Sequence, residues 1–297
     1  MVQFCLDGMS VAVLGGDERE VFLAVDLLSM GAKVTVCGLP EERLPDAIKW
    51  YPIPDSCLEG AKAVILPARG VDESGLIYSP HVKEPLALTE DLVSKFPADT
   101  LVFVGVAGPF LKNLLIPKGF RLIELMRDNE VAILNSIPTA EGAVQLAMEM
   151  MATTIHGSSA FVIGFGRTGT TLARLLSAMG AKTTVIARRN EHLARIYEMG
   201  LRPVHHKEMP LFIGDADVIF NTVPALVLTE QVLEKVSVHS LIIDLASPPG
   251  GTDFVAAKRL GIRAMLAPGL PGKVAPKTAG SILAKAIART LTGEMTT

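Results

Sequence analysis

Residues 158–189 read SSAFVIGFGRTGTTLARLLSAMGAKTTVIARR, and this stretch points to the fold class more firmly than any other part of the sequence. The apolar run at 161–163 predicts a buried strand, which leads into a glycine-rich turn. A helical pattern follows over 170–179, and a second strand is expected over 183–187. A strand, a GxGxxG turn and a helix in this order are typical of a dinucleotide-binding βαβ unit.

The three glycines of the turn have separate roles in such a unit. Gly164 would make the tight turn, Gly166 would let the pyrophosphate approach the backbone, and Gly169 would let helix and strand pack closely. Arg167 and Thr168 begin the helix, whose free N–H groups and positive dipole end attract phosphate. We therefore expect a dinucleotide to bind at this turn.

The end of the second strand indicates which dinucleotide is bound. An NAD site uses an acidic residue there for the ribose 2′-hydroxyl, whereas an NADP site uses arginine for the 2′-phosphate. Here Arg188 and Arg189 follow the strand, and the nearest carboxylate is that of Glu191. A guanidinium can bind phosphate in bidentate fashion. The sequence therefore predicts NADP, with a solvated surface pair as the alternative interpretation of the two arginines.

The first half of the chain carries the same pattern. A shift of 149 positions places VLG (13–15) on VIG (162–164) and MGAK (30–33) on an identical MGAK (179–182). Asp17 and Glu20 then stand where the second half has Gly166 and Gly169. Carboxylates at these positions would repel phosphate. We expect two doubly wound halves, of which the first has kept the fold and lost the dinucleotide.

Length and composition suit a protein of two α/β domains. The chain has 297 residues, of which 49% are hydrophobic and 5% aromatic, as expected for buried parallel sheets. A formal net charge of −3 gives no reason to expect a nucleic-acid partner. We find no signal peptide and no convincing membrane span, and expect a cytoplasmic protein with no membrane partner. The three scattered cysteines favour neither a disulfide framework nor a metal site.

The predicted fold class is α/β, with two Rossmann-like doubly wound domains related by an internal repeat. Residues 1–138 would form a flavodoxin-like or Rossmann-like substrate domain, which is the degenerate repeat. Residues 139–276 would form the NADP-binding Rossmann domain, and residues 277–297 a C-terminal helix that packs back on the first domain. A helix that bridges the domains is expected to open within 135–141, with Thr139 as its N-cap.

Loops that follow the strands of the second half would gather at the carboxyl edge of its sheet, where open α/β sheets bind ligands. Strands are expected there at 217–221, 241–245 and 264–266. The residues expected to bind the cofactor are Gly164, Gly166, Arg167, Thr168, Gly169, Arg188, Arg189, Asn221, Thr222, Val223, Pro224, Ala246 and Ser247.

Six longer stretches carry a family resemblance. They are VAVLGGDERE (11–20), LNSIPTAEG (134–142), IHGSSAFVIGFGRTG (155–169), ARRNEHLARIYEMGL (187–201), LIIDLASPPGGTDF (241–254) and LAPGLPGKVAPKTAG (266–280). In this order and at this spacing they resemble the family of the dipicolinate synthase A subunit, over essentially the full chain. Each piece is short, and their order and spacing make the combined match specific.

The resemblance implies an NADP-dependent enzyme in the mother cell of a spore-forming bacterium, on a branch of the lysine pathway. Its implied reaction converts 4-hydroxy-tetrahydrodipicolinate, or the dihydrodipicolinate formed by its dehydration, to dipicolinate during sporulation. It also implies a flavoprotein-like partner, the B subunit of dipicolinate synthase. We further expect the chain to form a homo-oligomer.

A substrate with two carboxylates calls for cations and for hydroxyl or N–H donors. The residues expected to bind it, from their positions around a cleft between the two domains, are Arg69, Ser136, Thr139 and Thr278. The expected catalytic residues are Ser247, Lys277 and Glu141. For each of these residues, a helix cap, a turn or a solvated charge is an equally good interpretation.

Two other functions remain open at this point. A D-2-hydroxyacid or alanine dehydrogenase-like enzyme would share the two-domain plan. The hydroxyacid enzymes use a histidine in the loop after the sixth strand, however, and no histidine follows His239 here. A non-catalytic NADP-binding scaffold subunit is the other alternative, since strong acid–base residues are sparse.

Overall fold

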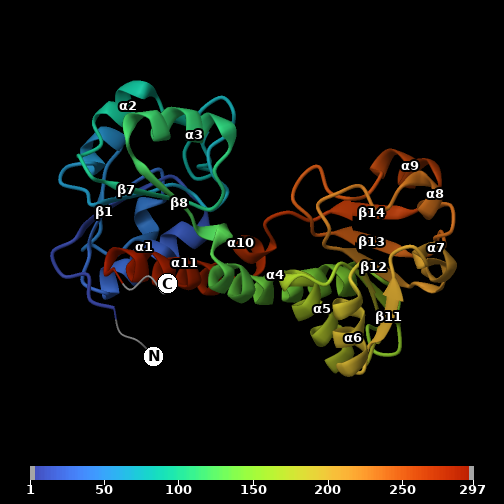
Figure 1. Cartoon of the computed structure of the whole chain (residues 1–297). Coiled ribbons are helices and arrows are strands. Elements are labelled where there is room, and N and C mark those ends of the chain that lie inside the picture. The colour runs from blue at the N-terminus through green and yellow to red at the C-terminus, as the bar shows by residue number, and fades with distance from the viewer. Residues whose placement is uncertain (1–3, 294–297) are drawn as a thin grey trace. The chain divides into compact units, whose positions relative to one another are not determined.

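The computed structural model describes residues 4–293, which divide into two compact units. The first unit runs to Asn135 and resumes at Ala275, and the second unit is Ser136–Val274. The boundaries expected from the sequence, after residues 138 and 276, lie within three residues of these. Each unit is an α/β fold with its own parallel sheet (Figure 1).

The first unit contains a six-stranded sheet in the order β3-β2-β1-β4-β7-β8, with all neighbouring strands parallel. Strands β1, β2 and β3 follow one another toward one edge of the sheet. The chain then crosses back to place β4 on the other side of β1, and β7 and β8 follow toward the opposite edge. This is the Rossmann order, so the flavodoxin-like alternative does not hold. The strands are β1 (Ser10–Leu14), β2 (Lys33–Cys37), β3 (Lys49–Trp50), β4 (Ala63–Ile65), β7 (Leu101–Val104) and β8 (Arg121–Glu124), with a separate antiparallel pair β5 (Leu76–Ile77) and β6 (Leu86–Ala87).

The second unit repeats this topology in a six-stranded parallel sheet with the order β11-β10-β9-β12-β13-β14. Its switch point, where the strand order reverses, lies between β9 and β12. Open α/β sheets bind ligands beyond the carboxyl ends of the strands at such a point. The strands are β9 (Ser159–Ile163), β10 (Lys182–Ala187), β11 (Arg202–His205), β12 (Val218–Asn221), β13 (Leu241–Asp244) and β14 (Arg263–Leu266).

Helices cover both faces of each sheet. Those of the first unit are α1 (Glu18–Ser29), α2 (Glu90–Ser94), α3 (Pro109–Leu115) and α11 (Pro276–Leu291). Those of the second are α5 (Arg167–Ala178), α6 (Asn190–Glu198), α7 (Met209–Phe212), α8 (Glu230–Leu233), α9 (Phe254–Arg259) and α10 (Leu270–Val274). The remaining α-helix of the described chain, α4 (Asn129–Met150), begins in the first unit and ends in the second.

Strand β1 shows how the sequence produces these layers. After the half-buried Ser10, its residues are fully buried and alternate between two cores: Val11 and Val13 face α1 and α11, whereas Ala12 and Leu14 face α2 and α3. A strand that is buried on both faces must be apolar along its whole length, which is why VAVL carries no polar residue.

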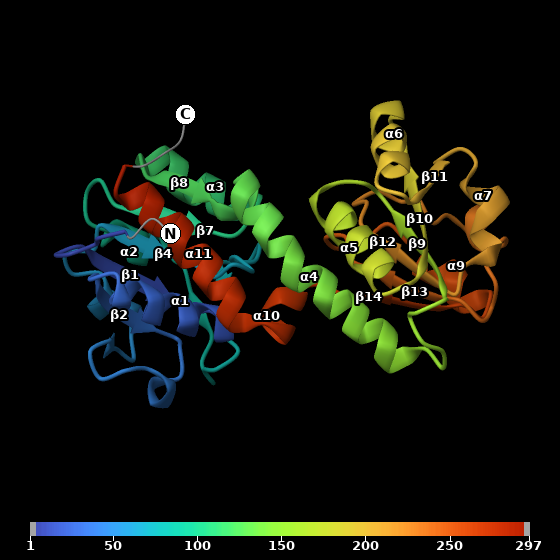
Figure 2. The same cartoon turned by 90° about the horizontal axis from the view of Figure 1, so that it is seen from below.

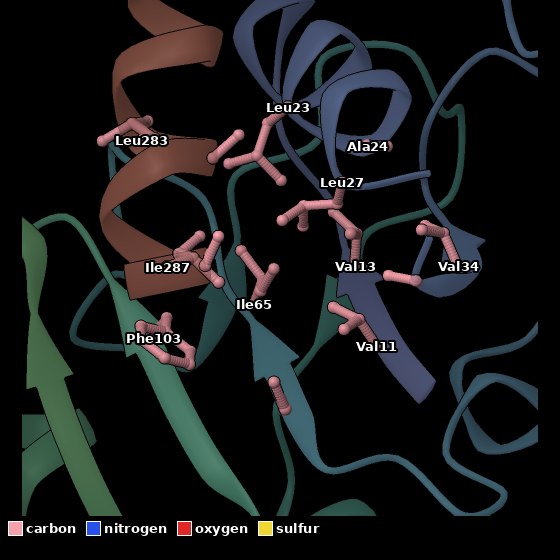
Figure 3. Close-up of a cluster of buried hydrophobic side chains, with 14 of the residues drawn as sticks. Val11, Val13, Leu23, Ala24, Leu27, Val34, Ile65, Phe103, Leu283 and Ile287 are labelled. Carbon is pink, nitrogen blue, oxygen red and sulfur yellow. The ribbon is translucent and has the colours of Figure 1, made fainter. Parts of the chain in front are cut away.

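The C-terminal helix α11 completes the core of the first unit. Figure 3 shows Ile287 of α11 directed toward Ile65 of β4 and Phe103 of β7, and Leu283 belongs to the same buried cluster as Leu23 and Leu27 of α1. Full burial of one leucine or isoleucine side chain contributes about 1.5–3 kcal/mol. In Figure 2, α11 runs beside α1, with which it makes extensive contact.

The internal repeat is visible in the element boundaries. Strand β1, helix α1 and strand β2 begin at residues 10, 18 and 33, and their counterparts β9, α5 and β10 begin at residues 159, 167 and 182. Each pair is separated by the same 149 positions that relate the two halves of the sequence. The two units therefore share one backbone frame through the first strand, the turn and the first helix.

The expected start of the bridging helix was wrong. Helix α4 already begins at Asn129, so Thr139 lies in its interior and Pro138 is accommodated within it. The start is set by Asp128, whose Oδ1 accepts hydrogen bonds from the backbone N–H groups of Glu130 (2.8 Å) and Val131 (3.2 Å). Part of α4 is buried, including Val131, Ala140, Ala143 and Ala147, and this burial offsets the cost of an internal proline, which is about 3 kcal/mol.

Candidate functional site

A pocket of about 1080 Å³ lies at the carboxyl edge of the second sheet. It is bounded by the turn between β9 and α5, by the ends of β10 and β11, and by the loops after β12 and β13. Its lining residues are Ile163–Thr168, Ile186–Arg189, His192, His206, Lys207, Met209, Pro210, Thr222–Val227, Thr229, Val232 and Leu245–Ser247. The pocket therefore occupies the switch point, where a dinucleotide is expected to bind.

The glycines of the β9–α5 turn differ in what surrounds them. A Cβ on Gly164, where φ is +100°, would clash with the Thr222 hydroxyl, and a Cβ on Gly169 would clash with the carbonyl oxygen of Gly164. Both positions thus require glycine for packing. A Cβ on Gly166 would meet nothing within 4 Å. The space beside Gly166 opens into the pocket, so a pyrophosphate can approach the backbone there.

The start of α5 supports the same assignment. Gly166 is its N-cap residue, and no side chain within the described part of the chain caps the helix there. The first N–H groups of a helix have no intrahelical partners, and the helix dipole adds partial positive charge at this end. An open glycine next to an uncapped helix start is a suitable place for phosphate. The residues present therefore fit a bound dinucleotide.

One end of the pocket is basic. Arg188 and Arg189 follow β10 as exposed side chains, and His206 and Lys207 follow β11 beside them. Partial burial, together with the positive charges of His205, Lys207 and Arg188, lowers the pKa of His206. These cations would attract an anionic group at this end of the pocket.

Arg189 is held in place by two neighbours. Its Nη2 lies 2.5 Å from His192 Nε2, and its Nε lies 3.2 Å from a carboxylate oxygen of Glu191. Among residues 4–293, no ion pair involves Arg188. The basic end thus holds one arginine that is already positioned and a second with no carboxylate partner.

The other end of the pocket is formed by two loops. Thr222 donates a hydrogen bond from Oγ1 to the carbonyl oxygen of Ile163 (2.9 Å), which ties the loop after β12 to β9. Leu245, Ala246 and Ser247 continue from β13. Since β10 and β11 lie on one side of β9 and β12 and β13 on the other, the basic end and these loops lie on opposite sides of the phosphate turn.

Most of the residues expected to bind the cofactor line this pocket. Gly164, Gly166, Arg167, Thr168, Arg188, Arg189, Thr222, Val223, Pro224, Ala246 and Ser247 do so. Gly169 and Asn221 do not line it, because both are buried behind its wall. They shape the pocket instead: Gly169 packs against Gly164, and Asn221 holds the loop after β12.

The same place in the first unit is closed. Asp17 caps α1, where its Oδ1 accepts from the backbone N–H of Arg19 at 3.0 Å, and Arg19 binds both Asp17 oxygens at 2.8–2.9 Å. Glu20 accepts from the backbone N–H groups of Asp17 and Ala68, each at 2.8 Å. The donors that could bind phosphate are therefore already paired with the chain's own carboxylates.

Glu20 is 1% exposed, and this changes its ionisation. Burial, the largest influence, raises the pKa of Glu20 to about 7, against the opposing positive charge of Arg19. The pKa of Asp17 shifts the opposite way. Burial alone would raise it, but the hydrogen bonds and positive charge of Arg19 hold it below its ordinary value. From the sequence, these carboxylates were expected to repel phosphate. The structure shows that they also accept hydrogen bonds from backbone N–H groups of the turn, as a bound phosphate would.

The expected substrate and catalytic residues are divided between the units. In the second unit, Ser247 is an exposed pocket residue, Glu141 is exposed on α4, and Thr139 is half-buried on the same helix. Ser136 is 1% exposed, and its Oγ lies 2.6 Å from the hydroxyl of Thr171, so it links α4 to α5.

In the first unit, the exposed guanidinium of Arg69 lies 4.5 Å from the centre of the Tyr78 ring. Lys277 and Thr278 are exposed in the first turn of α11. The segment that leads there is not an open loop as the sequence suggested, because α10 occupies Leu270–Val274.

Several pocket residues were missed by the sequence reasoning. They include Phe165, His192, His206 and Lys207. The last two follow β11, the third strand of a Rossmann half, whose carboxyl end borders the adenosine side of such a site, so only the strand topology could have indicated them. Among residues 4–293, no group of three or more possible metal-ligating side chains gathers, and Cys5, Cys37 and Cys57 are free thiols.

Comparisons with known proteins agree with this geometry. Residues 10–126 match the model of the N-terminal domain of the dipicolinate synthase A subunit. Residues 132–244 match that of the NAD binding domain of D-isomer specific 2-hydroxyacid dehydrogenases. The chain is 40% identical over 288 residues to the dipicolinate synthase A subunit of Bacillus subtilis (strain 168), covering 96% of this chain and 97% of the relative. The chain belongs to the family of the dipicolinate synthase A subunit.

Solved structures of the family share this fold. That of the dipicolinate synthase A subunit from Bacillus halodurans superposes with a TM-score of 0.93 at 39% identity, covering 97% of this chain and 99% of that one. The Bacillus subtilis structure gives a TM-score of 0.90 at 38% identity, with 98% of both chains covered. Family membership and the dehydrogenase-type domain together support an oxidoreductase role with a nicotinamide dinucleotide cofactor.

The structure also bears on membrane association. Within residues 4–293, no helix combines the length and the apolar character needed to cross a bilayer.

Proposed function

We propose that this protein is an NADP-dependent dehydrogenase that produces dipicolinate. The observation that carries the choice of NADP is the basic end of the pocket, where Arg188, Arg189, His206 and Lys207 surround the position expected for the ribose 2′-substituent. No carboxylate replaces the arginines at the end of β10, as an NAD site would require. A phosphate there gains charge-assisted hydrogen bonds that a hydroxyl cannot make to the same extent.

The proposed substrate is 4-hydroxy-tetrahydrodipicolinate or the dihydrodipicolinate that it forms by losing water. Loss of one hydride and one proton from the dihydro ring leaves the aromatic pyridine dicarboxylate. Bound NADP⁺ would accept the hydride and become NADPH. Since aromatisation favours the product, the chain's main tasks are to bind the ring, orient it and exclude water.

The structural evidence is stronger for some of the residues proposed for these tasks than for others. Ser247 is the strongest candidate, because it is exposed in the pocket at the end away from the basic cluster. Its hydroxyl can donate to a substrate carboxylate or carry a proton. Arg69 and Lys277 are proposed to neutralise the two substrate carboxylates, and Thr278 and Thr139 to donate hydrogen bonds. Ser136 is not retained for this role, because it is buried and its hydroxyl is hydrogen-bonded to that of Thr171. Glu141, an exposed carboxylate on α4, is the proposed proton acceptor.

The biological setting is proposed from the family. The Bacillus subtilis relative is by its name one subunit of dipicolinate synthase, so we propose that this chain acts with the enzyme's B subunit, which resembles a flavoprotein. We place it in the cytoplasm of the mother cell during sporulation, on a branch of the lysine pathway, as a homo-oligomer.

The two alternative functions would require different features of the chain. A D-2-hydroxyacid dehydrogenase is favoured by the match of residues 132–244 to its NAD binding domain. It is disfavoured because His239 is the last histidine of the sequence, so the loop after β14 lacks the histidine that such an enzyme uses. A scaffold subunit would bind NADP without turnover.

One experiment separates these functions. Purified protein is mixed with NADP⁺ and freshly generated 4-hydroxy-tetrahydrodipicolinate, in the presence and in the absence of the B subunit. Both NADPH and dipicolinate are quantified, and we expect equal molar amounts of the two products. Turnover of D-2-hydroxyacids instead would favour the first alternative, and NADP⁺ binding without any turnover would favour the scaffold.

A further inference from the structure

A buried carboxylate stands behind the pocket at the end of β13. Asp244 is 0% exposed. It accepts four hydrogen bonds, from Asn221 Nδ2 (3.0 Å), the backbone N–H groups of Ala246 (3.0 Å) and Gly251 (2.8 Å), and Thr252 Oγ1 (2.6 Å). No ion pair found among residues 4–293 involves this carboxylate.

The partners of Asp244 indicate that it is ionised. Each of them is an N–H or O–H group, and an ionised carboxylate accepts hydrogen bonds without donating any. The 2.6 Å bond to Thr252 has the short length of a charge-assisted hydrogen bond. A buried charge without an ionic partner is costly and is retained only where donors satisfy it and the structure or function uses it.

Asp244 is connected to both loops that line the end of the pocket away from the basic cluster. Through Ala246 it holds the loop after β13. Through Asn221 it holds the loop after β12, because the Asn221 side chain accepts from the backbone N–H of Val223 (3.0 Å) and donates to its carbonyl oxygen (3.1 Å). Val223 and Ala246 line the pocket, so the Asp244 charge lies directly behind the wall that they form.

We propose that Asp244 positions these two loops and that its negative charge makes the pocket prefer the oxidised dinucleotide. This rests on the proposed function, in which the basic end holds the adenosine half and the nicotinamide lies against the opposite loops. The nicotinamide ring carries a positive charge when oxidised and none when reduced. A fixed negative charge behind a dry wall attracts only the charged form, and the low dielectric strengthens that attraction.

The test compares the dissociation constants of NADP⁺ and NADPH, measured by calorimetry on the full-length protein. The wild type is expected to bind NADP⁺ more tightly than NADPH. Asp244→Asn keeps the shape of the side chain and removes its charge. The ratio of the two constants should then move about tenfold toward NADPH, equivalent to 1.4 kcal/mol.

Thr252→Val is the matched control, because it removes one hydrogen bond from Asp244 and keeps the charge. It should weaken both cofactors by a similar factor and leave their ratio unchanged. If Asp244→Asn changes both affinities equally, Asp244 is only structural and the inference fails while the proposed function stands. If Asp244→Asn does not fold, tighter binding of NADPH than of NADP⁺ by the wild type overturns the inference. If neither cofactor binds the wild type, the proposed function itself fails.

Discussion

The turn between β1 and α1 and the turn between β9 and α5 are two versions of one structural element. They begin 149 residues apart, and the helices that follow them are both twelve residues long. In the first turn, Asp17 and Glu20 satisfy the N–H groups of Asp17, Arg19 and Ala68 from within the chain. In the second, no side chain occupies the space beside Gly166, and Gly169 packs against the carbonyl oxygen of Gly164.

The difference shows that a helix start can be completed in two ways. Its unpaired N–H groups can be satisfied permanently by carboxylates of the same chain, or left for the phosphates of a ligand. The same backbone frame supports both, and we propose that the side chains at two pairs of positions, 17 with 166 and 20 with 169, contribute to which unit binds a cofactor. The first unit also fills the space beside Gly15, where Ile77 and Ser79 lie against the turn.

Converting the second turn toward the first should have the largest effect. Gly166 has φ −90° and ψ −164°, which aspartate adopts readily, so Gly166→Asp should cap α5 as Asp17 caps α1 and leave the fold stable. A negative charge about 4 Å from a phosphate costs roughly 4 kcal/mol, so NADP⁺ binding should weaken on the order of a thousandfold. Calorimetry measures the affinity, and thermal unfolding measures the stability.

Gly166→Asn is the matched control for that substitution, since asparagine has the size and capping ability of aspartate without its charge. It should bind NADP⁺ much more tightly than Gly166→Asp does. Equal affinities for the two variants would show that the carboxylate charge is not what excludes the dinucleotide from the first unit.

The next effect concerns how the free energy of unfolding of the first unit depends on pH. Glu20 keeps its proton up to about pH 7 in the folded state, whereas its ordinary pKa is 4.5. The folded state therefore binds more protons between these values, and raising the pH through this interval should lower the free energy of unfolding by about 3 kcal/mol. Trp50, the only tryptophan, lies in the first unit and reports its unfolding by fluorescence.

Glu20→Gln tests the origin of this dependence. The glutamine cannot titrate, so the fluorescence-detected stability should change less between pH 5 and pH 7 than it does in the wild type. The variant should also be less stable by about 1–3 kcal/mol at pH 5, because an amide N–H₂ cannot accept from one of the two backbone N–H groups. An unchanged slope with pH would assign the dependence to another group.

A smaller effect is expected at the basic end of the second unit. Arg188→Ala removes an exposed guanidinium that lines the pocket, and the preference for NADP⁺ over NAD⁺ should fall by roughly ten- to a hundredfold, or about 1.5–3 kcal/mol. Arg195→Ala is the control, since Arg195 is paired with Glu198 on α6 and does not line the pocket. An equal change in both variants would mean that overall charge, rather than a phosphate contact, sets the preference.

The smallest effect is predicted for substrate binding. Lys277→Met should raise the KM for substrate severalfold, because one carboxylate loses its cation, and should change the NADP⁺ dissociation constant by no more than about twofold. Lys285→Met, at another exposed lysine of the same helix, should leave both constants unchanged. If Lys277→Met keeps wild-type kinetics, Arg69 becomes the first candidate for that carboxylate.

Much of the fold was predictable because it follows from local patterns. The apolar runs and the glycine turn placed β9, α5 and β10 within a few residues, and the repeat extended this frame to β1, α1 and β2. The start of α4 was missed because proline and threonine at 138 and 139 resemble a helix start. Tertiary burial and the cap from Asp128 decide it instead.

The pocket was predictable where its residues belong to a motif and not where they depend on topology. Gly166 and Arg188 could be assigned from their spacing along the chain. His206 and Lys207 could not, because their place beside Arg188 follows from the pairing of β11 with β10. The role of Asn221 was also misjudged: its position after a strand predicted contact with the cofactor, and its actual partners are Asp244 and Val223.

The most direct test of the central claim is a calorimetric titration of the full-length protein with NADP⁺ and, separately, with NAD⁺. The two units have the same fold, and only the second is proposed to bind a dinucleotide. We predict one NADP⁺ per chain and an affinity for NAD⁺ at least tenfold weaker. Two NADP⁺ per chain would contradict the claim that the carboxylates close the first turn, and equal affinities would contradict the assignment of NADP to the second.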